Sequence, residues 1–579
     1  MGLERRPDRA LTIIGMSQIY CIILVTVALA LPLIHLATNG KLNICVPIIY
    51  VCVLFLVAIL FLIYVHAYLL KGLSSYRPFA LFEPSHKRKF ANSDDESRSS
   101  GGGHVNPAFT PDEDENRDIV DSDPSRPLKE LYTLRALPKI TMFGHGDANY
   151  PNFFLRVGAI VFGIGSMLYD GIRLCHHMGD LIGCKKADAY DISVCIMVVL
   201  HFIFTFYQLY FLFRNSRISI NAHKDFCRFG LMHMVATNLA IWILIVIQET
   251  GYQDNIVTSK DNVTADAISC NKPPIMVHLE ILIRPYLFPL VVQCSIVCAI
   301  SAFIMYANIG LHERLQLRVL ASGVMPLAYL HHYKRSKPTS RQGMSCHRAY
   351  AGLFGGIFFL VLILLAIIVY ILLKSQSTWS KIAYLMYSTS EIVALFILLI
   401  IVIVALVFIQ KLSLRFIEKK KVDEILLMAS LFCVLVFDGF TLVLSLYVGT
   451  KAKLAPSIYF GPLVVGVLRS ALSSIESVLQ ICLIFDGFRR HCGDKCQFKL
   501  KPGRGPITFV LIVNVALWYF YMFQTTTCFT SKEIYAFYFS HSWLSIFYTC
   551  APIVVFFRFL SAACLYDVWK QSYEKQKVF

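Results

Sequence analysis

The chain has 579 residues, of which 56% are hydrophobic and 16% charged, and its formal net charge is +17. Soluble domains contain about 45–50% apolar and about 25% charged residues, so this composition excludes a soluble globular protein and indicates one that crosses a membrane repeatedly. The positive charge does not indicate nucleic-acid binding, because the basic residues of such proteins gather in cytoplasmic loops.

Long apolar runs follow one another along the whole chain. A helix needs about 20 mostly apolar residues to cross the hydrocarbon core of a bilayer. Twelve runs meet this requirement, and we predict an all-α polytopic membrane protein with these spans: 11–36, 42–70, 153–175, 191–213, 226–248, 276–308, 349–373, 384–410, 425–449, 458–485, 507–529 and 541–568.

The spans divide the chain into five segments. We expect two helices in 1–70, a linker in 71–151, four helices in 152–308, a second cytoplasmic linker in 309–348 and six helices in 349–579. The centre of 71–151 is acidic, rich in Gly, Ser and Pro, and nearly without aromatic residues. Such a segment cannot bury enough apolar surface to fold alone, so we expect a disordered cytoplasmic linker.

The lysine and arginine distribution predicts the orientation. The loops after spans four, six, eight and ten carry most of the basic loop residues. Basic loops stay in the cytoplasm, so we expect a multi-pass protein of the cell membrane with both termini cytoplasmic. Asn262, in an Asn-X-Thr sequon after span five, would then be an outward glycosylation site. Cys184 and Cys270 fall on outer loops, and the sequence leaves open whether they pair.

A repeated sequence marks polar groups inside the spans. Asn238 begins Asn-Leu-Ala-Ile-Trp in span five, and Asn514 begins Asn-Val-Ala-Leu-Trp in span eleven. The preceding spans hold Gln208 and Gln480 at nearly the same offset, which indicates two pseudo-repeated six-helix halves. We expect Asn238 to meet Gln208 and Gln293, and Asn514 to meet Gln480. Converging amides either satisfy one another as a plug or order a file of water.

Ionisable residues inside other spans are further candidates, because a charge in hydrocarbon needs a partner or water. His233 shares span five with the repeated sequence. Asp438 lies deep in its span, whereas Glu391 lies closer to an expected interface, so we predict that Asp438 has the larger functional role. Arg558 in the last span also needs a partner.

Enzyme signatures are absent from the sequence. It contains no phosphate-binding loop, nucleophile elbow or zinc-protease motif, so we expect neither an enzyme nor a cofactor. His491, Cys492 and Cys496 leave open a metal knuckle or lipidation, but three ligands at loose spacing are a weak zinc signal.

Four stretches resemble the otopetrin family of proton-selective channels. They are LRVGAIVFGIGSMLYDG in span three, RFGLMHMVATNLAIW in span five, PYLFP in span six and FFRFLSAACLYDVWK at the end of span twelve. The resemblance implies a homodimer whose subunits contain two similar domains, spans 1–6 and 7–12. It implies proton conduction in response to extracellular acid, with membrane lipids, sterol among them, as further partners.

The resemblance also implies a central polar cluster of glutamine, asparagine and an ionisable group in each half. The four amide residues of the repeat match the first two members. The third members differ, because Gln293 stands where the family has a glutamate. Tyr548 and Leu560 stand where it has histidines. Zinc modulation at outward histidines is a further family property, for which His176, His177 and His541 are candidates.

Two other functions compete with the proton channel. A secondary transporter that moves a solute with protons would also explain the repeat and the buried carboxylates. A non-conducting, otopetrin-like membrane scaffold or regulator would explain the missing glutamate and histidine.

Overall fold

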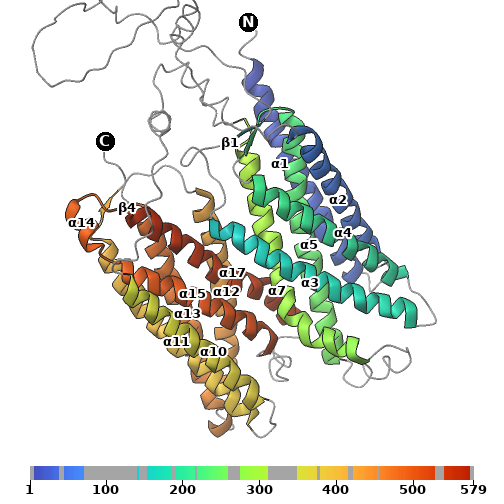
Figure 1. The fold of residues 1–579 in the computed structure, drawn as a ribbon. Helices are drawn as coiled ribbons and strands as arrows, with labels where there is room; N and C mark the ends of the chain where they lie inside the picture. Colours follow the sequence, from blue (N-terminus) through green and yellow to red (C-terminus); the bar gives the residue numbers. More distant parts are fainter. Residues whose placement is uncertain are drawn as a thin grey trace, which may run out of the picture.

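The computed structural model describes residues 5–37, 43, 45–70, 140–142, 153–183, 189–215, 218–258, 274–310, 349–374, 379–414, 421–452, 456–527 and 540–573. All twelve predicted spans are helices (Figure 1). The N half contains α1 (Arg5–Ala37), α2 (Cys45–Tyr64) with the π-helical turn η1 (Val65–Leu69), α3 (Phe153–Gly183), α4 (Ala189–Asn215), α5 (Lys224–Thr258) and α7 (Pro274–Ala307). The C half contains α10 (Tyr350–Lys374), α11 (Ser380–Ile409), α12 (Lys421–Ala452), α13 (Pro456–Phe488), the short α14 (Lys495–Leu500), α15 (Arg504–Thr527) and α17 (Ser540–Tyr573).

Two small antiparallel sheets lie at the end of the molecule where α1 begins and α17 ends (Figure 1). β1 (Ile140–Met142) pairs with β2 (Ile218–Ile220), and β3 (Ser413–Leu414) pairs with β4 (Arg490–His491). β1 belongs to the segment 71–151 that was expected to be disordered, so three residues of that segment have regular structure. The rest of 71–151, nearly all of 309–348, Asn262 and the two cysteines whose pairing was left open, Cys184 and Cys270, lie outside the described residues.

Each half is a closed ring of six helices, and the two rings have the same packing order. In the N half the order around the ring is α1, α5, α7, α3, α4 and α2. In the C half it is α10, α15, α17, α12, α13 and α11, which is the same sequence of first, fifth, sixth, third, fourth and second helix. The predicted duplication is therefore a property of the three-dimensional packing as well as of the sequence.

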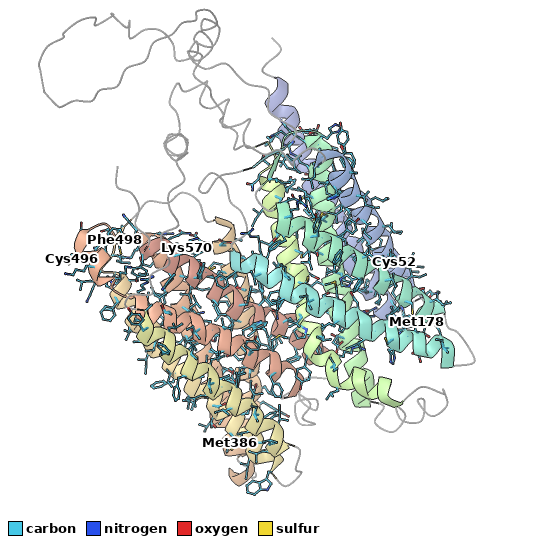
Figure 2. The ribbon with its side chains drawn as sticks, in the orientation of Figure 1. Cys52, Met178, Met386, Cys496, Phe498 and Lys570 are labelled. Carbon is cyan, nitrogen blue, oxygen red and sulfur yellow. The ribbon has the colours of Figure 1, made fainter. Side chains whose placement is uncertain are left out.

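Apolar side chains on the outside of the rings face the bilayer. Along α10, for example, Phe354, Phe358 and Leu372 are 65–69% exposed. Met178 and Met386 likewise point outward from α3 and α11 (Figure 2). Exposed apolar surface of this extent on long helices is the arrangement that a hydrocarbon environment requires. The molecule is a multi-pass membrane protein.

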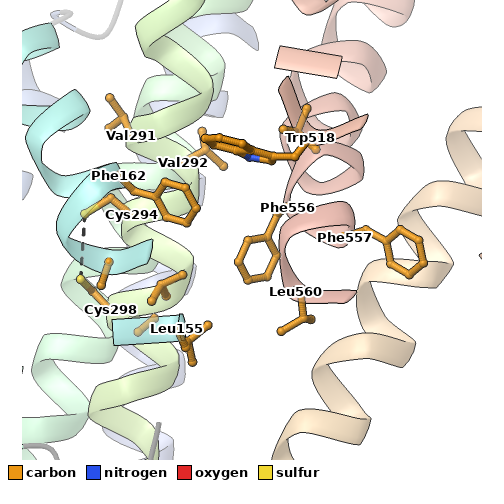
Figure 3. Packing of buried hydrophobic residues seen from close by; sticks show 14 of the residues in the cluster. Leu155, Phe162, Val291, Val292, Cys294, Cys298, Trp518, Phe556, Phe557 and Leu560 are labelled. Atoms are coloured by element: carbon orange, nitrogen blue, oxygen red, sulfur yellow. Dashed lines mark hydrogen bonds between the residues drawn. The ribbon is translucent and has the colours of Figure 1, made fainter. Parts of the chain in front are cut away.

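The two rings meet along a packed seam. α15 and α17 of the C half contact α7 of the N half, and α17 also contacts α3 and α5. Phe162 of α3 lies 6.0 Å from Trp518 of α15 and 4.8 Å from Phe559 of α17, measured between ring centroids. Figure 3 shows Phe162 and Trp518 on facing sides of this seam, with Phe556 below them.

Candidate functional site

The two amide pairs predicted from the repeated sequence are present, one in each ring. In the N half, Gln208 Nε2 donates to Asn238 Oδ1 at 3.0 Å, and Asn238 Nδ2 donates to Gln208 Oε1 at 2.8 Å. In the C half, Gln480 and Asn514 make the same reciprocal pair at 3.1 and 2.7 Å. Each asparagine also donates to the backbone carbonyl four residues earlier. All four side chains are buried, so each buried amide has partners within the protein.

The pairs cross the interiors of the rings. The glutamine is on the fourth helix of its half and the asparagine on the fifth, and these helices lie on opposite sides of the ring. A side-chain bond between opposite walls closes the interior at that level. The two halves therefore share a central polar constriction at equivalent positions.

Gln293 is not part of the N-half pair, contrary to the expectation of three converging amides. Its Oε1 accepts a hydrogen bond from Nε1 of Trp518 at 3.1 Å, and its Nε2 donates to Sδ of Met522 at 3.4 Å. Both partners belong to α15, so Gln293 lies in the seam between the halves. The span assignment did not reveal this, because it does not show which face of α7 turns toward the other ring.

His233 has a partner on each ring nitrogen. Nε2 lies 3.0 Å from the carbonyl oxygen of Leu54, and Nδ1 lies 3.0 Å from the hydroxyl of Tyr20. A carbonyl only accepts, so Nε2 carries a hydrogen, and in the neutral ring Nδ1 then accepts from the tyrosine. The histidine thereby ties α5 to α2 and α1.

A second group of buried polar pairs lies further from the constriction in the N half, toward the end opposite the sheets. Asp170 of α3 bonds to His201 of α4, with a carboxylate oxygen 2.9 Å from the ring Nδ1. Arg173 of α3 donates to Gln248 of α5 at 3.1 Å. One residue beyond Gln248, Glu249 accepts from Arg284 Nε of α7 at 2.9 Å. These groups form a series of polar contacts along the ring.

The C half contains a more strongly charged group. Glu391 of α11 accepts from Arg469 Nε of α13 at 2.7 Å, and both side chains are buried. Asp438 of α12 accepts from the hydroxyl of Ser474 at 3.2 Å and also interacts electrostatically with Arg469. Glu391 is only 1% exposed, because it packs inside the ring against Arg469.

Arg558 has the partner that its position required. Its Nη1 donates to Oε2 of Glu476 at 2.6 Å, and the two side chains are 1% and 0% exposed. Its guanidinium also lies over the ring of Tyr521, 5.5 Å from the centroid. Tyr548 packs its ring against Phe288 of α7, with the ring centroids 5.5 Å apart, and so belongs to the seam.

The outward histidine candidates fall at one described cluster. His177 Nδ1 lies 2.8 Å from Asp191, and His176 Nε2 lies 3.5 Å from Asp180. The ligand atoms of His177, Asp180 and Asp191 all lie within 4.8 Å of one another, at the end of the molecule opposite the sheets. One imidazole and two carboxylates are a donor set that fits a zinc ion. His541 is the second residue of α17, but its side chain lies outside the described part of the chain.

The second candidate metal site, made of His491, Cys492 and Cys496, is not formed in the described part of the structure. Cys492 is buried and its thiol contacts the carbonyl of Gln497, whereas Cys496 is exposed on α14. The described residues show no grouping of His491, Cys492 and Cys496 of the kind that a metal ion needs. The loose spacing in the sequence is thus matched by a loose arrangement in space.

Several of these residues were not identified from sequence. Asp170 and His201 are the clearest cases, since both are buried and bonded to each other. His201 is a lone histidine in an apolar span, seven residues before Gln208 and therefore on the same face of α4. That spacing was a usable signal.

Twelve helices in two equivalent rings, each closed by a buried amide pair and lined by further polar pairs, define a duplicated membrane protein with polar ring interiors. Such interiors are typical of proteins that move ions or small solutes. A family model described as Otopetrin matches residues 154–267 and 253–559, and the chain belongs to the otopetrin family.

Known relatives carry the names of proton channels. The chain is 26% identical over 478 residues to proton channel OtopLc of Drosophila melanogaster, a match that covers 76% of this chain and 29% of that protein. It is 29% identical over 192 residues to proton channel OTOP1 of Mus musculus, covering 28% of this chain and 32% of the relative. It is 24% identical over 196 residues to proton channel OTOP2 of Homo sapiens, covering 31% and 34%. The matched part spans about a third of the length of these relatives.

Proposed function

We propose that this protein is a proton channel, which conducts protons down their electrochemical gradient when the extracellular side becomes acidic. The observation that carries the proposal is the pair of buried amide constrictions, one in each ring of a chain whose relatives are named proton channels. An amide hydrogen-bonds water but does not exchange protons near neutral pH. Proton transfer past the amides therefore depends on water and on nearby ionisable groups.

In the C half, Asp438 is the group to which we assign proton exchange. Its carboxylate has a serine hydroxyl as hydrogen-bond donor, whereas Glu391 and Glu476 are each bonded directly to an arginine. An arginine bonded directly to a carboxylate holds that side chain in place as an ion-pair partner, so we assign those two glutamates a structural role. Asp438→Asn keeps the shape and removes the exchangeable proton, so we expect lower current at normal surface expression. The matched variant Glu391→Gln should lower the stability of the protein and its surface expression, and not the current per surface channel.

Whole-cell recording during an extracellular acid step tests the function. A proton channel gives an inward current whose reversal potential follows the proton gradient. A proton-coupled secondary transporter gives current only with its solute present. A non-conducting scaffold gives none, and then the proposal fails.

The scaffold is favoured by one specific observation in the N half. Gln208 and Asn238 satisfy each other, and the family's glutamate is replaced by Gln293 in the seam. If the pair is a structural plug, Asn238→Ala leaves Gln208 without its partner and costs about 1–3 kcal/mol, so expression falls. If the pair lines a path, current per surface channel changes while expression holds. Gln293→Glu should raise the current if a glutamate here transfers protons, and an unchanged current would refute that role.

Topology and assembly complete the proposal. We assign the end with the two sheets to the cytoplasm, which puts both termini inside the cell and Asn262 outside. Tags at residue 100 and at the C-terminus should stain only after permeabilisation of the cells. The functional unit is a homodimer in the cell membrane, in contact with lipids that include sterol. Cross-linking of the protein in intact membranes should give a dimer band.

Zinc modulation is assigned to the outward cluster of His177, Asp180 and Asp191, with His176 beside it. Their donor atoms are already close, so an ion needs little rearrangement. His177→Ala should weaken the effect of extracellular zinc on the current and leave the current without zinc unchanged.

A further inference from the structure

A buried carboxylate–histidine pair outside the predicted site lies on the wall of the N-half ring. We infer that Asp170 and His201 form a proton-exchange site, at which Nε2 of His201 takes up and releases a proton. The inference rests on the proposed proton conduction for its role, but the exchange itself can be measured without any current.

The geometry fixes which nitrogen of the His201 imidazole carries the hydrogen. Oδ1 and Oδ2 of Asp170 lie 2.9 and 2.8 Å from Nδ1 of His201, and the two side chains are 2% and 5% exposed. An ionised carboxylate only accepts hydrogen bonds, so Nδ1 carries the hydrogen and Nε2 keeps a lone pair. Among the described residues, the hydrogen bond of His201 is made through Nδ1, and Nε2 makes none. By contrast, both nitrogens of His233 are used for bonding, so that histidine has no free acceptor.

The surroundings favour uptake of one proton. A carboxylate on Nδ1 orients an imidazole and stabilises the imidazolium that forms when Nε2 is protonated. From α2 the ring of Phe55 covers the histidine at 5.3 Å between centroids, and from α7 the Cys294 thiol faces Asp170. On α3 itself, Arg173 lies one turn further along and donates to Gln248.

The remaining charges nearby are paired with each other. On α5 and α7, Glu249 and Arg284 form their own ion pair at 2.9 Å. Among these neighbours, the carboxylate in direct contact with the His201 ring is that of Asp170. A proton that arrives at Nε2 therefore turns a buried anion into a buried ion pair.

The exchange step is simple. Hydronium gives its proton to Nε2, an N–H bond forms and a water molecule is left. Release to another water molecule breaks that bond and restores the neutral ring, while Asp170 stays ionised and Nδ1 keeps its hydrogen throughout. Histidine is suited to this cycle because its charge changes between about pH 5 and 8.

The position of the pair gives it a role in conduction. His201 lies seven residues from Gln208 on α4, about 10 Å along the helix, and on the same face. His201 thus places an ionisable group near the amide constriction of the N-half ring. Gln293 does not take this place, because it lies in the seam between the two halves. The equivalent position in the C half, seven residues before Gln480, is Ser473, whose hydroxyl hydrogen-bonds the Asp438 carboxylate, and serine does not titrate. The two rings would then exchange protons through different residues.

Two variants and one control test the site. His201→Gln removes the imidazole that exchanges the proton, and Asp170→Asn removes the charge that stabilises the imidazolium, while both keep hydrogen bonding. His66→Gln makes the same change as His201→Gln at an exposed histidine of η1. We expect current per surface channel to fall by about tenfold or more in each test variant and not in the control. The double variant should be no worse than either single one, because the residues act as a unit. Should His201→Gln fail to reach the surface, Asp170→Asn carries the same comparison.

A second readout separates this inference from the proposed function. Infrared difference spectra of the purified protein, labelled with ¹³C-histidine, should show imidazolium formation on acidification that is reduced in His201→Gln. Identical spectra would overturn the exchange site. A His201 signal together with unchanged current would overturn its role in conduction. A His201 signal in a wild-type protein without proton current would refute the proposed function and leave the exchange site standing.

Discussion

The buried ion pair between Glu476 and Arg558 should behave differently when one partner is removed than when both are replaced. Its side chains are 0% and 1% exposed and share one hydrogen bond of 2.6 Å. Arg558→Met leaves the Glu476 charge without its cation inside the C-half ring. Removing one partner of a buried pair costs about 3–5 kcal/mol, a large fraction of the total stability of a typical protein. We therefore expect a lower unfolding midpoint in detergent and poor surface expression.

Replacing both residues removes the stranded charge. Buried ion pairs exchanged for apolar residues are often neutral or stabilising by about 1–4 kcal/mol, so Glu476→Leu with Arg558→Met should restore much of the lost stability. Thermal unfolding of the wild type, both single variants and the double variant completes a mutant cycle. If the double variant loses as much stability as the two single variants lose together, the reasoning is refuted.

The neighbouring pair gives a matched comparison. Glu391→Gln removes the bonded partner of Arg469, but Arg469 keeps its electrostatic interaction with Asp438. The arginine is therefore less isolated than Glu476 would be without Arg558. We expect a smaller loss of stability from Glu391→Gln than from Arg558→Met, measured in the same assay.

Two further predictions concern packing and thiol chemistry. A Cβ at Gly352 of α10 would overlap the carbonyl oxygen of Gly505, so Gly352→Val should cost at least about 1–3 kcal/mol, whereas Gly355→Ala, with Phe509 at 3.4 Å, should be tolerated in thermal unfolding. Burial raises the pKa of the Cys492 thiol to about 11, so this thiol stays protonated at pH 8. We expect a maleimide to label the exposed Cys496 and not Cys492 in the folded protein. Labelling of Cys492, detected by mass spectrometry, would contradict this.

The sequence was sufficient for the spans and for the central amides. Hydrophobic length alone predicts the twelve helices, because lipid forces backbone hydrogen bonds to close within each helix. The repeat around Asn238 and Asn514 predicts the two amide pairs, because a repeated sequence in a duplicated fold occupies equivalent positions. These features depend on local sequence, so they can be read without knowing how the helices pack.

Features that depend on helix ends and on packing between rings could not be predicted in this way. The third span was expected to end near residue 175, which put Asp170 close to an interface, but α3 continues to Gly183, and Asp170 is buried against His201 of α4. The partners of Gln293 come from the other half of the chain. Arg469, which neutralises Glu391, is 78 residues away in sequence. Only the packing of α11 against α13 brings the two together.

The ring order has a consequence for how the protein is made. The first helix of the N half, α1, packs mainly against the fifth, α5. Because α5 comes much later in the sequence, α1 emerges from the ribosome long before its main neighbour exists. About 190 residues separate Ala37 from Lys224, and synthesis at about 5–20 residues per second takes roughly 10–40 s to cover them. During that interval α1 lies in the bilayer without its main neighbour. The growing chain therefore presents α1 with α2 beside it, but with Ser17 and Tyr20 still lacking their partners Tyr306 and His233, to membrane-resident chaperones.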